Sequence, residues 1–160
     1  MARIKVLFVC LGNICRSPAA EAIFLKLISK RGVQDEFIVD SAGTGSWHVG
    51  KKADERMRTA AKERGINIES IARQININDF EEFDFIITMD NSNFNNVCNF
   101  KSRESSNSNI KIIKIQSFAS LFKKYDEVPD PYFGGDDGFE NVIDILEDSV
   151  GGFLKSISQF

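Results

Sequence analysis

The chain has 160 residues, the usual length of one domain and enough to bury a core without disulfide bonds. Its hydrophobic fraction of 42% and charged fraction of 27% are those of an ordinary globular protein and argue against both disorder and a membrane protein. The net charge of −3 argues against a nucleic-acid-binding surface, because binding to a phosphate backbone needs a concentrated basic face.

The three cysteines, at positions 10, 15 and 98, are too few and too unevenly spaced for a disulfide framework or a zinc site. Reduced thiols are typical of the cytosol, so we expect a cytoplasmic protein. Residues 1–20 imitate a signal peptide, but Asn13 and Arg16 interrupt the region where cleavage would occur. No segment approaches the roughly 20 apolar residues of a membrane span, and we expect no membrane partner.

Apolar, β-branched runs alternate with stretches of helical periodicity along the chain. The first helical stretch has Pro18 in its first turn and Gly32 as a stop signal. The last is longer but is weakened by Gly151 and Gly152. In chain order the patterns predict a strand at 4–9, a helix at 17–32, a strand at 36–42, a helix at 53–65, a strand at 83–89, a short helix at 91–100, a solvated loop at 101–109, a strand at 110–115 and a helix at 136–157.

This alternation predicts a single α/β domain over residues 1–160, with a four-stranded parallel sheet and helices on both faces. Ligands of such sheets bind beyond the carboxyl ends of the strands. The stretch CLGNICRSP, residues 10–18, follows the first strand and therefore lies at that edge.

Residues 10–18 have the composition of an anion site that also carries a nucleophile. A turn from a strand into a helix exposes backbone N–H groups, and the helix dipole adds positive potential there. Gly12 would let the backbone close around the anion, and the planar Arg16 guanidinium suits two phosphate oxygens. The same positive groups would favour the thiolate of Cys10. Ser17 offers a hydroxyl to cap the helix.

A cysteine followed six positions later by an arginine is a loose pattern, and a purely structural turn is the alternative. Here, however, VCLGNICRSP resembles the phosphate-binding loop of the low-molecular-weight protein tyrosine phosphatases, C-x5-R-S-P. The resemblance covers the whole chain, because DSAGTGSWHVG, ADERM, ARQI, FDFIITMDNSN and VPDPYFG follow in the family's order. It implies a flavodoxin-like phosphatase fold and an enzyme with no metal and no cofactor.

The resemblance implies a role for each residue that matches the family's motifs. Cys10 would be the nucleophile that becomes a phosphocysteine, Arg16 would bind the phosphoryl oxygens, and Asp130 would be the general acid, with Asp126 and Glu127 as alternatives. Asn13, Ser17 and Ser41 would hold the loop, and Asp90 would be a second acidic residue near the site. The phosphate-binding residues would be Leu11, Gly12, Asn13, Ile14, Cys15, Arg16 and Ser17.

Two aromatic residues would line the mouth of the cleft by resemblance, Trp47 and Tyr132. The alternative for Trp47 is that its indole packs under its own loop. We expect His48, the single histidine, to be non-catalytic, because a phosphate dianion and a helix terminus can replace a histidine base.

The other two cysteines have different expected roles. Cys15 lies close enough to Cys10 in sequence to form a disulfide, which the family uses as a reversible guard against oxidation. Cys98 follows NNV in a weak helical pattern and is expected to be a small buried hydrophobe.

The chain departs from the family's pattern at two places. Lys51 and Lys52 stand in KKADER near where family members often have proline, which could alter the phosphopeptides that are accepted. Tyr132 is followed by Phe133, where many members have a second tyrosine.

The sequence therefore predicts a monomeric phosphatase that acts on phosphotyrosine proteins or peptides and on small aryl phosphates, with inorganic phosphate as product and inhibitor. One alternative is an arsenate reductase on the same scaffold, which would need additional downstream cysteines where the chain has only Cys98. Another is a non-catalytic phosphate-binding module, which would need neither the thiol nor the acid of DPYF.

Overall fold

The computed structural model describes residues 2–158 except 108, 133 and 136, so Phe133 lies outside the described residues. The strands are β1 (Ile4–Cys10), β2 (Phe37–Gly43), β3 (Phe85–Thr88) and β4 (Lys111–Lys114). The α-helices are α1 (Arg16–Lys30), α2 (Glu55–Lys62), α3 (Asp79–Glu82), α4 (Asn91–Glu104) and α5 (Asp137–Ile157), with short 3₁₀ turns at Gln34–Glu36 and Ile115–Phe118.

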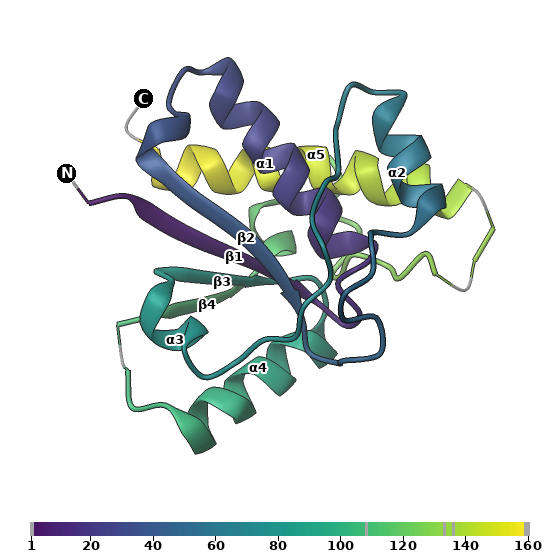
Figure 1. The fold of residues 1–160 in the computed structure, drawn as a ribbon. Coiled ribbons are helices and arrows are strands. Elements are labelled where there is room, and N and C mark those ends of the chain that lie inside the picture. The colour runs from purple at the N-terminus through teal and green to yellow at the C-terminus, as the bar shows by residue number, and fades with distance from the viewer. Residues whose placement is uncertain (1, 108, 133, 136, 159–160) are drawn as a thin grey trace.

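All four strands are parallel, in the order β2-β1-β3-β4, which confirms the predicted α/β fold. The helices α1 and α5 lie on one side of the sheet and α4 lies on the other (Figure 1). Successive side chains of the central strand β1 point to opposite faces of the sheet and contribute to two buried clusters. Val6 and Phe8 belong to one cluster, whereas Leu7 and Val9 belong to the other. β1 is thus buried on both faces and ends at the carboxyl edge with Cys10.

The final helix, α5, lies where it was predicted. The helix expected at 53–65 is shorter, spanning Glu55–Lys62 as α2, and the short helix α3 was not expected. The helix expected at 91–100 extends through Glu104, so the first part of the polar run at 101–109 is helical and the predicted loop begins at Ser105. α5 continues through Gly151 and Gly152 without a break. A Cβ at Gly152 would collide with the carbonyl oxygen of Phe118, so the close approach of α5 to that turn requires a glycine.

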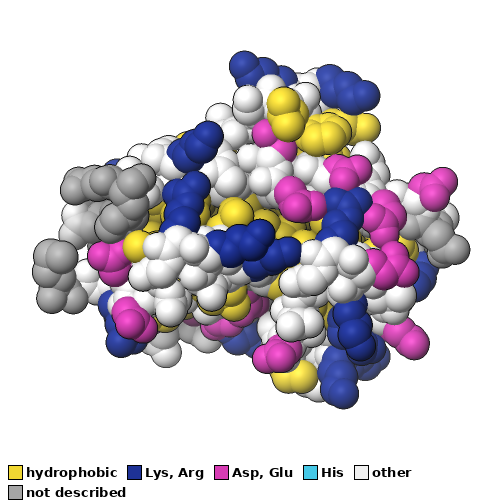
Figure 2. Space-filling model, turned by 90° about the horizontal axis from the view of Figure 1, so that it is seen from above, with side chains coloured by type: hydrophobic (Ala, Val, Ile, Leu, Met, Phe, Trp, Pro, Cys, Tyr) yellow, Lys and Arg dark blue, Asp and Glu magenta, His cyan; other side chains and the backbone are white. Residues whose placement is uncertain are grey.

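Surface charges are mixed. On the face shown in Figure 2, Lys and Arg side chains are interspersed with Asp and Glu side chains. Arg64 is an example, because its guanidinium donates to three carboxylates of α5, those of Glu140, Asp144 and Glu147. Across the described residues, no helix is long and apolar enough to cross a membrane.

Candidate active site

The loop between β1 and α1 is held from behind by the end of β2. The amide of Thr44 donates to the carbonyl of Cys10, and the amide of Gly45 donates to that of Leu11, both at 2.9 Å. A Cβ at Gly43 would lie 2.8 Å from the Leu11 carbonyl oxygen, so this approach requires a glycine. The loop is therefore fixed to the sheet before any ligand binds.

The loop turns at Asn13, which has a left-handed φ of 57°, and not at Gly12, the residue that the sequence favoured for backbone freedom. The Asn13 side chain fixes this conformation. Its Nδ2 donates to Ser17 Oγ at 2.8 Å and to Ser41 Oγ at 3.0 Å, and its Oδ1 accepts from the Arg73 amide at 3.0 Å. Three of the predicted supporting residues thus form one buried network.

The Cys10 sulfur lies at the centre of the loop and is surrounded by polar groups. The Asn13 amide donates to Sγ at 3.3 Å, and Ser17 Oγ lies 3.0 Å from Sγ. The expected capping role of Ser17 is wrong, because Cys15 is the N-cap residue of α1 and the Ser17 hydroxyl faces Cys10 instead.

The Arg16 guanidinium is buried beneath the loop, with its side chain 3% exposed. It donates to Asp90 Oδ2 at 2.7 Å, to the Val128 carbonyl at 3.1 Å and to Asp130 Oδ2 at 3.4 Å. Burial acts to lower the pKa of Arg16, but the charge of Cys10 and the hydrogen bond to Asp90 outweigh it and raise that pKa above its usual value. Arg16 therefore stays positive and ties together three segments of the chain.

Asp90 and Asp130 contact Arg16 in different ways. Asp90 is the N-cap of α4, and its Oδ1 accepts from the Asn93 amide at 2.7 Å, so both of its oxygens are engaged. Asp130 is one-third exposed, and its Oδ1 accepts from the Tyr132 amide of its own turn, at 3.0 Å. Asp130 is the acid that can reach a ligand.

The alternative acids lie elsewhere. Glu127 accepts from the Asn91 amide at 2.6 Å at the start of α4, and Asp126 lines a different surface depression. Neither lines the cavity above Cys10.

A cavity of about 400 Å³ opens above Cys10 and brings most of the predicted site residues together. Trp47 and Tyr132 form two of its walls, and His48 lies against Tyr132 with ring centroids 5.8 Å apart. The Trp47 ring lies against Gly45 of its own loop, and the residue is 67% exposed where it lines the cavity. The lining residues are Cys10, Leu11, Gly12, Ile14, Cys15, Arg16, Trp47, His48, Asp130 and Tyr132.

The two remaining cysteines differ in position. Cys15 is buried and lines the cavity beside Cys10; burial, with the charges of Asp54 and Cys10, raises the pKa of its thiol. Cys98 is only partly buried on α4, so the expectation of a buried residue is met in part. Among the described residues, no group of three or more His, Cys, Asp or Glu could hold a metal ion.

Sequence reasoning missed a second shell of charged residues behind the loop. Glu21 of α1 accepts from Ser41 Oγ at 2.5 Å, and Ser41 in turn accepts from Asn13. Arg73 donates to Asp40 at 3.1 Å and to both oxygens of Asp79 at 3.0 Å. Arg73 lies 60 positions from Asn13, and only the Arg in the ARQI motif was a signal in the sequence.

Glu21 gives the site a pH-dependent stability. Burial raises the pKa of Glu21 from 4.5 to about 7, and the Asp40 carboxylate adds to this, while the hydrogen bond from Ser41 opposes it. Since the unfolded chain loses this proton near pH 4.5, the folded state loses stability as pH rises from there to about 7.

We expect wild type to lose about 3 kcal/mol of unfolding free energy, relative to Glu21→Gln, between about pH 4 and pH 8. Urea unfolding at the two pH values measures this difference. Glu63→Gln, at the exposed end of α2, is the control: it keeps Glu21 and should show the same loss as wild type. Equal pH dependence in all three proteins would contradict the assignment.

Comparisons with known proteins agree with one another. The family described as low molecular weight phosphotyrosine protein phosphatase matches residues 5–159. A low molecular weight phosphotyrosine protein phosphatase of Schizosaccharomyces pombe is 44% identical over 158 residues, which covers 97% of each chain.

Two solved structures have the same fold. A protein tyrosine phosphatase from Entamoeba histolytica, crystallised with Hepes in its active site, is 46% identical with a TM-score of 0.89 and covers 96% of each chain. A Drosophila arginine phosphatase is 37% identical with a TM-score of 0.90, covering 98% of this chain and 100% of that one.

Proposed function

The chain belongs to the low molecular weight phosphotyrosine protein phosphatase family, and from that premise we propose that it hydrolyses phosphotyrosine through a phosphocysteine on Cys10. One observation carries the proposal. Cys10, Arg16 and Asp130 all line one cavity of about 400 Å³ whose walls include Trp47 and Tyr132. This arrangement combines a nucleophile, a phosphate-binding cation and an acid beneath an aromatic entrance.

In the first step, the Cys10 thiolate attacks phosphorus while the bond from phosphorus to the phenolic oxygen breaks. Arg16 and the backbone N–H groups of the loop hold the non-bridging oxygens. The substrate dianion replaces Asp130 as a partner of Arg16, and its negative charge favours the protonated form of the Asp130 carboxyl. Asp130 then gives that proton to the leaving oxygen, so a neutral phenol departs.

In the second step, water attacks the phosphorus of the phosphocysteine. Asp130, now a carboxylate, accepts a proton from this water, and the bond between sulfur and phosphorus breaks. Cys10 returns as a thiolate and inorganic phosphate is released. The hydrogen bonds from the Asn13 amide and from Ser17 are in place to stabilise that thiolate as a leaving group.

The cavity walls favour an aromatic substrate. Leu11, Ile14, Trp47 and Tyr132 present apolar and aromatic surface above the anion site, which suits the flat ring of phosphotyrosine or of an aryl phosphate. Phosphate, as the product, should compete for the same loop. We propose that the enzyme acts in the cytoplasm, because its active site uses a reduced thiol, and that it is a monomer of one domain.

The alternatives have less support. An arsenate reductase would need cysteines that relay a disulfide from Cys10, and Cys98 lies on α4 outside the cavity lining. A non-catalytic phosphate-binding module would not require Asp130 at the rim. The Drosophila relative is an arginine phosphatase, so a phosphoarginine peptide is an informative comparison substrate.

The direct test is hydrolysis of an aryl phosphate at about pH 5 to 6 in the presence of a metal chelator. We expect phosphate and phenol in equal amounts, and faster turnover of a phosphotyrosine peptide than of its phosphoarginine counterpart. A folded sample without turnover would contradict the proposed function.

Reversible oxidation is a further expectation. Peroxide converts the Cys10 thiolate to a sulfenic acid, and Cys15, in the same cavity, can displace its hydroxyl as water and form a disulfide. A thiol reductant should then restore most of the activity of wild type. In Cys15→Ser most of the loss should be permanent, whereas the control Cys98→Ser should recover like wild type. Equal recovery in all three would show that Cys15 only packs.

A further inference from the structure

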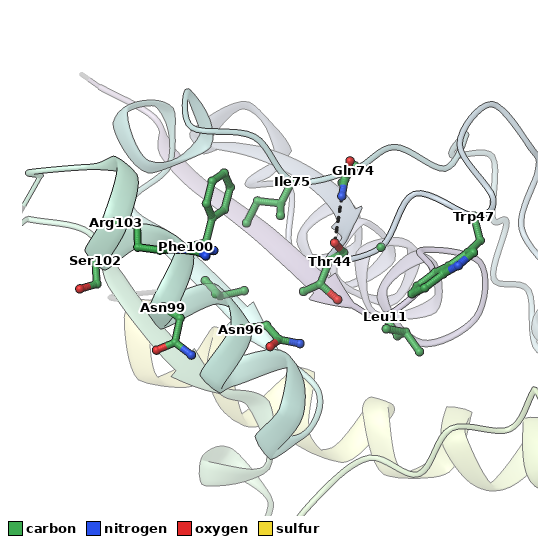
Figure 3. A pocket seen from close by; sticks show the side chains of 12 residues that line it. Leu11, Thr44, Trp47, Gln74, Ile75, Asn96, Asn99, Phe100, Ser102 and Arg103 are labelled. Atoms are coloured by element: carbon green, nitrogen blue, oxygen red, sulfur yellow. Dashed lines mark hydrogen bonds between the residues drawn. The ribbon is translucent and has the colours of Figure 1, made fainter.

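A second, larger pocket of about 790 Å³ lies beside the active-site cavity (Figure 3). It is formed by one face of α4, the segment after β2 and the residues Gln74 and Ile75. Leu11 and Trp47 line both pockets, so the two form a continuous surface. A polypeptide that extends from a phosphotyrosine at Cys10 across these two side chains would enter the second pocket.

The lining of this pocket combines an apolar floor with a polar rim. The floor is apolar. Ile75 and Val97 belong to the buried cluster under α4, and Phe100 packs against that cluster. Amide side chains make up much of the rim: Gln74, whose Nε2 donates to the Thr44 carbonyl at 3.1 Å, and the exposed Asn96 and Asn99. Each amide can both donate and accept, which suits the backbone of an extended polypeptide.

The charge of the pocket is concentrated at one end. Arg103 is the only ionisable side chain among the described residues that line it, and none of these residues is a carboxylate. Figure 3 shows Arg103 at the end opposite Leu11 and Trp47. Asn96, Asn99 and Arg103 follow one another at intervals of three and four, so they share a face of α4. An exposed guanidinium in a neutral pocket selects a carboxylate.

From these observations we infer that the pocket binds the polypeptide next to the phosphotyrosine, with an acidic side chain of the substrate paired with Arg103. The inference rests on the proposed phosphatase function. Asn96 and Arg103 are about 10 Å apart along the axis of α4, the length of about three extended residues. The ligand must therefore be a peptide of several residues, and a free aryl phosphate cannot reach Arg103.

The test compares two phosphotyrosine peptides of one sequence, the first with Glu and Asp near the phosphotyrosine and the second with Gln and Asn there. We expect wild type to have a kcat/KM about three- to fivefold higher for the acidic peptide, a size typical of one exposed ion pair. Arg103→Gln should abolish this ratio and leave aryl phosphate hydrolysis unchanged. Arg31→Gln makes the same charge change at the far end of α1 and should keep the ratio.

A binding measurement separates this inference from the proposed function. Trp47 is the only tryptophan and lies between the two pockets, so its fluorescence reports peptide binding to the inactive Cys10→Ser variant. We expect the acidic peptide to bind more tightly, and the difference to vanish when Arg103→Gln is added. This result without aryl phosphate turnover in wild type would support the pocket and contradict the phosphatase. An unchanged preference in Arg103→Gln, with turnover intact, would overturn the pocket alone.

Discussion

Replacement of Cys10 by serine is expected to lower turnover by at least about 10⁴-fold while phosphate binding is largely retained. A serine hydroxyl is a far weaker nucleophile than a thiolate, and no described histidine is placed to act on it as a base through a hydrogen bond to residue 10. The loop itself should persist, because its geometry depends on Asn13, Ser17 and Ser41 rather than on the sulfur.

Steady-state hydrolysis of an aryl phosphate gives the loss of turnover, and quenching of Trp47 fluorescence by phosphate gives the affinity. Cys98→Ser, which changes a thiol on α4 outside the cavity, is the matched control and should behave like wild type. Appreciable turnover by Cys10→Ser would mean that another group is the nucleophile.

The second large effect is expected from Asp130→Ala. The conjugate acid of a tyrosine leaving group has a pKa of about 10, so its departure needs a proton donor, and the loss in kcat for phosphotyrosine should be about 10²- to 10⁴-fold. For an aryl phosphate whose phenol is already acidic, the loss should be far smaller. The acidic limb of the pH-rate profile should also flatten.

The dependence on the leaving group distinguishes a general acid from a structural residue. Asp130 also accepts the Tyr132 amide, so its loss could disturb the turn that carries Tyr132, but such damage would affect both substrates equally. Asp126→Ala, four residues earlier and exposed, is the control and should change neither rate. Equal losses for good and poor leaving groups would make Asp130 a structural residue.

Local sequence patterns were sufficient to predict the sheet and the position of the loop. β1 and α1 are adjacent in sequence, so a buried run that ends at Cys10 and a helical stripe that begins near Arg16 place both residues at the edge of the sheet. The parallel pairing of the four strands follows from their alternation with helices.

The partners of those residues could not be derived from the local pattern, because they come from distant segments. Asp90 and Val128, 74 and 112 positions from Arg16, meet it only in the folded chain. Ser17 was misassigned for the same reason: a serine at a helix start usually caps it, whereas here contact with Cys10 and Asn13 takes the hydroxyl. Glu21 carries no signal in the local pattern, because its partner Ser41 comes from β2.

The residues near Asp130 illustrate a similar limit. Pro129 and Pro131 flank Asp130 and restrict the backbone of its turn, but the local sequence does not indicate what holds that turn over the site. The Val128 amide donates to the Met89 carbonyl at 2.9 Å while the Val128 carbonyl accepts from Arg16, which anchors the turn to the end of β3. The acid is therefore positioned by the same guanidinium that is proposed to bind the phosphate.

The covalent intermediate is the central claim, and its capture is the most direct test. An aryl phosphate labelled in its phosphoryl group is mixed with the enzyme, the reaction is stopped with acid within milliseconds, and the labelled peptide is identified by mass spectrometry. The account predicts phosphate on Cys10 in wild type, more of it when a good leaving group makes its formation fast, and none in Cys10→Ser. Label on any other residue would contradict the account. So would turnover with no labelled enzyme under conditions in which the phosphocysteine forms faster than it is hydrolysed.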